Sequence, residues 1–244
     1  MKTTRISPFP PTQWTLVVNA CRQGTAEEQQ RALESLCRDY WYPLYAFARR
    51  SGNRSEDAED MTQGFFHYLL ERDLVASANQ ELGKLRTFLL TAFQRYIGDV
   101  RSRGQALKRG GGHEILSLDV EAAERQFDEP LEALTPHEIF DRRWAQTILQ
   151  VTLVRLQESE IAAGKGDQFG ILESFLRPSS TAEGNYDEIA SSLEISSEAA
   201  RKAVSRLRGR FRDLLRTQIA DTLTLPSKEQ VDEELGALKI ALRG

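Results

Sequence analysis

Apolar residues recur three and four positions apart along almost the whole chain, with few alternating β-branched runs between them. That period places apolar side chains on one face of an α-helix, whereas a half-buried β-strand requires alternation. We therefore expect an all-α fold. The chain has 244 residues and is 40% hydrophobic, which is enough for helical cores in one ordinary domain or two small ones.

Three helices are expected to share a first core, at residues 25–50, 55–70 and 84–103. Thr25 and Glu28 form a capping box for the first helix, in which Pro43 can introduce a kink. Ser55 can cap the second helix, because acidic residues follow it in the first turn and suit the positive end of the helix dipole. Those acids are Glu56, Asp57, Glu59 and Asp60.

The glycines at 110–112 end this helical pattern, and a second start signal follows at Thr135, Pro136 and Glu138. The predicted organisation is a helical domain with an N-terminal extension at 1–111, an acidic linker at 112–135, a helix-turn-helix domain at 136–224 and a tail helix at 225–244. Ser227 and Gln230 can cap the tail helix. A regulatory contact and a packing brace are both open as its role.

The charges are unevenly distributed, although the net charge is only −4. Residues 84–109 carry seven cations against one anion, residues 114–141 carry nine acids against one cation, and residues 198–216 carry seven cations against two acids. A polyanion responds to such local distributions, and an acidic block of this kind is usually solvated. The two basic segments are the candidates for contact with nucleic acid.

The second basic segment belongs to a predicted helix-turn-helix, with helices at 186–193 and 198–222 joined by a turn at 194–197. A recognition helix reads bases with its first turns and holds phosphates with cations farther along. The base-facing candidates are Ser197, Glu198, Arg201, Lys202 and Ser205, and the phosphate-facing candidates are Arg206 and Arg208. A solvated amphipathic helix is the alternative interpretation.

The first basic segment combines cations with aromatic residues, a mixture suited to the backbone and bases of single strands. We expect Phe88 and Phe93 to lie in the core, because of their helical spacing, and the cations and the 79–84 loop to form the strand-binding surface. The candidates are Asn79, Gln80, Lys84, Arg86, Arg95, Arg101, Arg103, Lys108 and Arg109.

Other classes of protein fit the sequence poorly. Asp57, Glu59 and Asp60 do not share one helix face and the three histidines are scattered, so we expect no metal site, no cofactor and no enzyme activity. Cys21 and Cys37 are too few for a disulfide framework. Three prolines in the first eleven residues argue against a secretory signal, and no apolar run reaches membrane-spanning length. A cytoplasmic protein without membrane insertion is expected.

Particular residues resemble region two of the extracytoplasmic-function RNA polymerase sigma factors. They are Tyr40-Trp41-Tyr42-Pro43-Leu44-Tyr45, Gly52-Asn53 and Asp57-Ala58-Glu59-Asp60-Met61-Thr62-Gln63-Gly64-Phe65-Phe66. Residues 85–103 fit the family's next helix, and 186–215 fit its region-four helix-turn-helix. The chain departs from the family pattern at Glu194, where glycine is usual, at Arg201-Lys202-Ala203, and at 156–178, which lacks Leu-Pro-x-x-x-Arg.

The resemblance implies an alternative sigma factor that binds core RNA polymerase, recognises the minus-35 and minus-10 promoter elements and initiates transcription. It implies polymerase contacts at Asp57, Asp60, Gln63 and Phe66, minus-10 contacts from the first basic segment and minus-35 contacts from the second. The linker would thread toward the polymerase cleft, and an anti-sigma factor or other regulator would be a further partner. In the bacterial cytoplasm such a protein is nucleoid-associated when bound to polymerase. A helix-turn-helix regulator acting without polymerase and a helical protein-binding adaptor are the alternatives.

Overall fold

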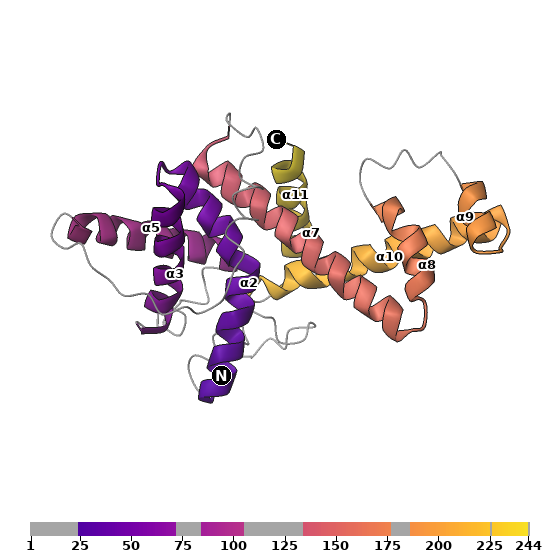
Figure 1. Cartoon of the computed structure of the whole chain (residues 1–244), viewed down its shortest axis with the longest axis horizontal. Helices are drawn as coiled ribbons and strands as arrows, with labels where there is room; N and C mark the ends of the chain where they lie inside the picture. Colours follow the sequence, from indigo (N-terminus) through magenta and orange to yellow (C-terminus); the bar gives the residue numbers. More distant parts are fainter. Residues whose placement is uncertain (1–23, 72–83, 105–133, 177–185, 225, 244) are drawn as a thin grey trace, which may run out of the picture. The chain divides into compact units, whose positions relative to one another are not determined.

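The computed structural model describes residues 24–71, 84–104, 134–176, 186–224 and 226–243. These residues form eight α-helices and one 3₁₀ helix, with no β-strand among them, so the expected all-helical fold is confirmed (Figure 1). The elements are α2 (Ala26–Arg50), α3 (Ser55–Glu71), α5 (Leu85–Gly104), α7 (Pro136–Ala162), α8 (Gly166–Leu172), η2 (Glu173–Leu176), α9 (Tyr186–Ser192), α10 (Ser197–Asp221) and α11 (Lys228–Arg243). None of the helices formed by these residues is both long and apolar enough to cross a membrane.

The chain divides into two compact units. The first comprises the residues up to Thr147 together with those from Ile219 onward, and the second comprises Ile148–Gln218. Both boundaries fall inside helices, α7 and α10, rather than in a linker. The units therefore have other bounds than the predicted domains: the start of α7, through buried Phe140 and Trp144, and the tail helix α11 both belong to the first unit. The predicted linker at 112–135 falls almost wholly outside the described residues.

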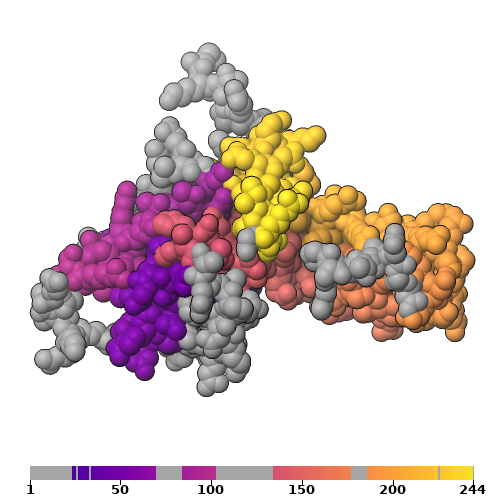
Figure 2. Space-filling view, turned by 90° about the horizontal axis from the view of Figure 1, so that it is seen from above, coloured from indigo at the N-terminus to yellow at the C-terminus, as the bar shows by residue number. Residues whose placement is uncertain are grey.

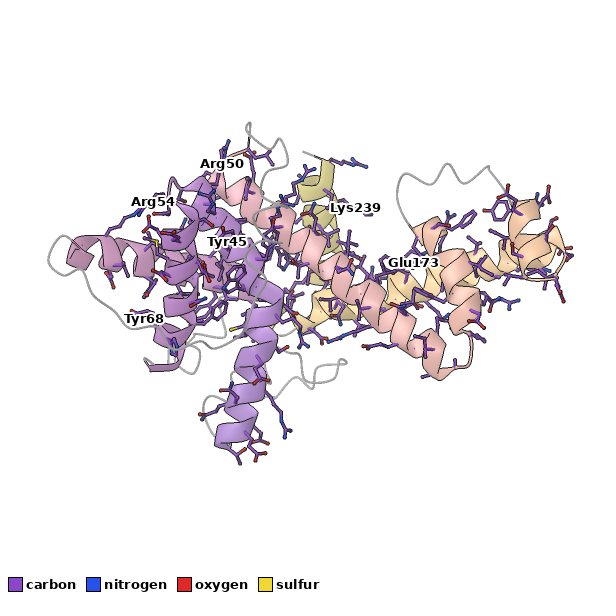
Figure 3. All side chains as sticks on the ribbon, viewed as in Figure 1. Tyr45, Arg50, Arg54, Tyr68, Glu173 and Lys239 are labelled. Atoms are coloured by element: carbon purple, nitrogen blue, oxygen red, sulfur yellow. The ribbon has the colours of Figure 1, made fainter. Side chains whose placement is uncertain are left out.

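Helices α2, α3 and α5 pack on one another through aromatic side chains. Phe93 of α5 has its ring centroid 6.2 Å from that of Phe47 on α2 and 5.0 Å from that of Phe65 on α3. Within α2, Trp41 stacks on Tyr45, with ring centroids 4.9 Å apart. Tyr45, labelled in Figure 3, is fully buried. Burial of such side chains is the main contribution to the stability of this core, at about 1.5–3 kcal/mol each.

Gly64 is required by the packing of α3 on α5. A Cβ added at this position would meet the hydroxyl of Tyr96 at less than a van der Waals distance. The phenol ring of Tyr96 lies over the helix there, between Phe65 and Tyr68. Interiors are close-packed, so the absent side chain lets the two helices approach.

The predicted capping boxes are present at three helix starts. Thr25 Oγ1 accepts from the Glu28 amide at 3.3 Å while Glu28 Oε2 accepts from the Thr25 amide at 2.8 Å. The same reciprocal pairs join Thr135 to Glu138 and Ser227 to Gln230. Ser55 differs from the prediction, because it is the first helical residue of α3 and its hydroxyl hydrogen-bonds with the Tyr45 hydroxyl at 2.9 Å.

The second unit has its own core, formed by the C-terminal part of α7, by α8 and by the helix pair α9–α10. Its buried members are Leu156, Phe169, Leu172, Ile189, Ala190, Ala200, Val204 and Leu207. Helix α7 ends as predicted beside Gly164, whose φ of +71° is a left-handed conformation that glycine adopts without strain. The Lys165 amide then donates to the Glu160 carbonyl at 2.8 Å and closes the helix end.

Candidate nucleic-acid interface

A tight turn joins α9 to α10 in the second unit. The Ile195 amide donates to the Ala190 carbonyl at 2.9 Å and the Glu194 amide to the Ser191 carbonyl at 3.3 Å. These two bonds form a Schellman motif, which needs a left-handed residue after the helix. Glu194 supplies it with φ of +54°, at the position where the sequence lacks the glycine usual in this turn. A tight turn with a strained residue, Glu194, therefore joins α9 to α10.

Side-chain hydrogen bonds fix the start of α10 against α9. Ser196 Oγ accepts from the Ala199 amide at 3.2 Å and caps the helix, and the Ser197 hydroxyl donates to Asp187 Oδ1 at 2.6 Å. Ser197 thus has a bonded partner on α9, although it was predicted to face bases. Its role in this structure is to hold the first turns of the two helices together.

The face of α10 opposite its core is exposed and carries several predicted contact residues. Ala200, Val204 and Leu207 are buried, whereas Glu198, Lys202, Ser205 and Arg206 are exposed. Lys202 Nζ lies 2.7 Å from Glu198 Oε1, and both of these side chains are largely exposed. A surface pair of this type contributes little to stability, so a phosphate could displace the carboxylate at low energetic cost.

Three other arginines of α10 contact the second unit itself. The Arg201 guanidinium lies 5.5 Å from the centroid of the Tyr186 ring, within the range of a cation–π contact. Arg208 Nε donates to the Phe175 carbonyl at 3.1 Å. Arg210 pairs with the buried carboxylate of Glu160. Arg208 is therefore only half-exposed, whereas Arg201 remains exposed beside its ring partner.

The described cations of the first basic segment divide into an exposed set and a set that is paired with acids. Arg95 and Arg101 are exposed, and Arg101 Nη2 donates to Asn53 Oδ1 at 3.2 Å. Lys84 and Arg86 instead form ion pairs with Glu233 and Glu234 of α11. Asn79, Gln80, Lys108, Arg109 and the side chain of Arg103 lie outside the described residues.

Arg86 is enclosed on several sides. Its guanidinium lies 4.7 Å from the Trp144 ring centroid, pairs with Asp141, and donates to both carboxylate oxygens of Glu234. Only 15% of its side chain is exposed. In this structure the charge of Arg86 already has carboxylate partners and an aromatic cover, so a strand could bind it only by displacing a carboxylate. DNA contact at Arg86 stays a prediction.

Helix α3 presents acidic side chains at its start. Asp60 is exposed, Arg54 Nε lies 3.0 Å from Asp57 Oδ2, and Gln63 Nε2 donates to Glu59 Oε1 at 3.0 Å. Figure 3 shows Arg54 projecting outward where α3 begins. Burial and the neighbouring Asp60 raise the pKa of Glu59. Asp57, Asp60 and Gln63 are thus available to a partner from one end of α3.

Phe66 does not belong to that surface. Its side chain is 1% exposed and its ring lies 5.8 Å from the ring of Phe65, inside the first core. The prediction of a direct polymerase contact at Phe66 is not compatible with this position, because the buried ring offers almost no surface to a partner. The expected core position of Phe93 is confirmed, since its side chain is fully buried, and Phe88 is half-buried.

Within the described parts of the chain, no cluster of histidine, cysteine, aspartate or glutamate could hold a metal ion. Burial, with a smaller contribution from Glu34, raises the pKa of the Cys37 thiol to about 12. A thiol with that pKa is neutral near pH 7 and a poor nucleophile or metal ligand.

Comparison with known proteins finds no matching family model, no similar curated protein and no similar solved structure. A functional assignment therefore depends on the residues of this chain and their geometry.

Proposed function

We propose that this chain is an alternative sigma factor of the extracytoplasmic-function type, which binds core RNA polymerase and directs it to promoter DNA. The observation that carries the proposal is the helix pair α9–α10, whose tight turn leaves Glu198, Lys202, Ser205 and Arg206 on the exposed face of a basic helix. A helix with this exposed chemistry fits the major groove of duplex DNA.

The acidic start of α3 supports a protein partner. Exposed Asp60 and half-buried Gln63 offer a carboxylate and an amide one helical turn apart, and Asp57 lies on the same face. The polymerase contact is assigned to these three residues. Phe66 contributes to this contact only indirectly, because its buried ring holds α3 on the first core.

The exposed cations of α5 support contact with a separated strand. Arg95 and Arg101 are six residues apart on α5, which is less than two helical turns, and both are exposed. In the proposal they hold phosphates of the minus-10 region. Lys84 and Arg86 are not part of that exposed set.

A pull-down with purified bacterial core RNA polymerase, followed by run-off transcription, tests the proposal. The wild-type chain should bind core polymerase and initiate at defined sites, and Asp60→Ala with Gln63→Ala should lose both. Gln30→Ala with Glu34→Ala is the matched control, since this amide–carboxylate pair is also exposed on a helix, with Nε2 to Oε1 at 3.0 Å. The control variant should retain both activities.

The same experiment separates the alternatives. If the wild-type chain does not bind polymerase but binds duplex DNA without it, the chain is a helix-turn-helix regulator and the sigma-factor proposal fails. A protein-binding adaptor is indicated if neither polymerase nor DNA is bound. Loss of polymerase binding in the control as well as in the α3 variant would also contradict the role given to Asp60 and Gln63.

A further inference from the structure

Two acids of α11 form ion pairs with the two cations at the start of α5. Lys84 Nζ lies 2.9 Å from Glu233 Oε1 and 2.7 Å from Glu234 Oε1. Arg86 Nε and Nη2 donate to the two oxygens of Glu234 at 2.8 and 3.2 Å. We call these four residues the α5–α11 clasp. Figure 2 shows α11, in yellow, against the magenta surface of α5.

The geometry of the clasp is the geometry that these cations would offer to phosphate groups. An arginine fork binds a carboxylate or a phosphate through two parallel N–H bonds, and a lysine binds either anion as a point charge. Glu233 and Glu234 therefore occupy donors that a phosphate group would use. An acid and a phosphate cannot occupy the same donors at once.

The clasp is reinforced by the chain that leads into α11. The Leu85 amide donates to the Thr222 carbonyl at 3.0 Å, and Lys84 forms an isolated antiparallel bridge with Leu223. On α11 itself, buried Val231 and Leu238 flank fully buried Glu234. The start of α5 is thus held by backbone pairing and by two carboxylates.

From this geometry we infer that α11 is an autoinhibitory element, whose Glu233 and Glu234 compete with the phosphates of single-stranded DNA for Lys84 and Arg86. The inference rests on the proposed function for its biological meaning, because α5 is there the strand-binding helix. Displacement of the two carboxylates adds Lys84, and the Nε and Nη2 donors of Arg86, to the exposed Arg95 and Arg101, while Arg86 keeps its pair with Asp141. The tail helix then sets how much of α5 a strand can reach.

Fluorescence anisotropy with a labelled single-stranded DNA of mixed sequence tests the inference on the full-length protein. Glu233→Gln with Glu234→Gln should bind about ten-fold more tightly than wild type near 0.1 M salt, and the slope of log K against log salt should steepen by about 1.4. Glu27→Gln with Glu34→Gln, two exposed acids of α2, is the charge-matched control. Its affinity should change by less than about two-fold.

Glu234 is buried, so its substitution could destabilise the fold. A second variant therefore changes only the exposed acid of the clasp. Glu233 is 68% exposed, and Glu233→Gln leaves the Arg86–Glu234 bonds in place. Lys84 then keeps one carboxylate partner, Glu234 at 2.7 Å, in place of two. Because half of the competing acid is gone, this single change should tighten binding about three-fold and steepen the salt slope by up to about 0.7. Adding Lys84→Gln should remove that gain, because the cation that Glu233 paired with is then absent.

Unchanged or weaker binding by Glu233→Gln, in a protein whose circular dichroism and melting match wild type, would overturn the inference and make the acids a structural brace. The polymerase pull-down separates this result from the proposed function. If the variants gain affinity for the strand while wild type fails to bind polymerase, the competition stands and the sigma-factor proposal fails. If wild type binds polymerase but the variants gain no affinity for the strand, the competition is rejected and the sigma-factor proposal stands.

Discussion

Glu234 is joined to Arg86 by two parallel hydrogen bonds, from Nε to Oε2 at 2.8 Å and from Nη2 to Oε1 at 3.2 Å. The two residues are 148 positions apart in the sequence. This bond pair ties the tail helix to the third helix of the first core, and its carboxylate is 0% exposed.

Low pH should lower the free energy of unfolding of the first unit, because it protonates the carboxylate of Glu234. Burial opposes ionisation of Glu234, but hydrogen bonds from Arg86 and Lys84 outweigh it, so the pKa of Glu234 is lowered from its ordinary value of 4.5. A depressed native pKa contributes stability that is present above pH 4.5 and is lost as the pH falls through the native value. Urea unfolding between pH 3 and 7 should therefore show a stability difference between wild type and Glu234→Gln that shrinks with acid. A difference that is constant with pH would contradict this account.

Gly64→Ala should destabilise the first unit by about 1–3 kcal/mol, because the new methyl group meets the Tyr96 hydroxyl. In a Tyr96→Phe background the obstructing oxygen is absent and the next ring atom lies 3.5 Å from the added Cβ, an ordinary contact. There the alanine should be neutral or should stabilise α3 by up to about 1 kcal/mol, since it favours the helix over glycine. A double-mutant cycle in urea measures the coupling, and additive effects would refute the steric explanation.

Glu194→Gly should stabilise the second unit. A left-handed conformation costs a residue with a Cβ roughly 1–2 kcal/mol, and glycine escapes this cost while losing about 0.4–1 kcal/mol through its more flexible unfolded chain. A net gain of about 0.5–1 kcal/mol is expected, measured by amide hydrogen exchange in α9 and α10. Glu194→Ala keeps the strain and is the control. An equal gain in both variants would point to the carboxylate charge instead of the backbone.

Lys202→Ala with Arg206→Ala should weaken binding of duplex DNA and reduce its salt dependence. Each lost phosphate contact lowers the magnitude of the slope of log K against log salt by about 0.9, so the double variant should lose about 1.8. Lys228→Ala with Lys239→Ala removes the same charge from exposed positions of α11 and should leave the slope within error. Equal losses in both variants would mean that net charge, and not the face of α10, governs binding.

The start points of the helices were predictable because their signals are local. Thr25 with Glu28, Thr135 with Glu138 and Ser227 with Gln230 each lie three residues apart, and each pair forms the bonds that its spacing predicts. The turn at Glu194 was located for the same reason. Glu194 also shows the limit, since a glutamate gives no sequence signal for a left-handed residue.

Only the tertiary structure decided what each charged or aromatic side chain faces. A cation count places Lys84 and Arg86 in a basic segment, yet their partners Glu233 and Glu234 lie almost 150 residues away, and no local pattern joins them. Phe66 follows the acidic start of α3 closely but is buried, because the packing of three helices fixes the face it occupies. The sequence by itself determined the helices through period and caps, whereas long-range packing selected which of their charges stay exposed.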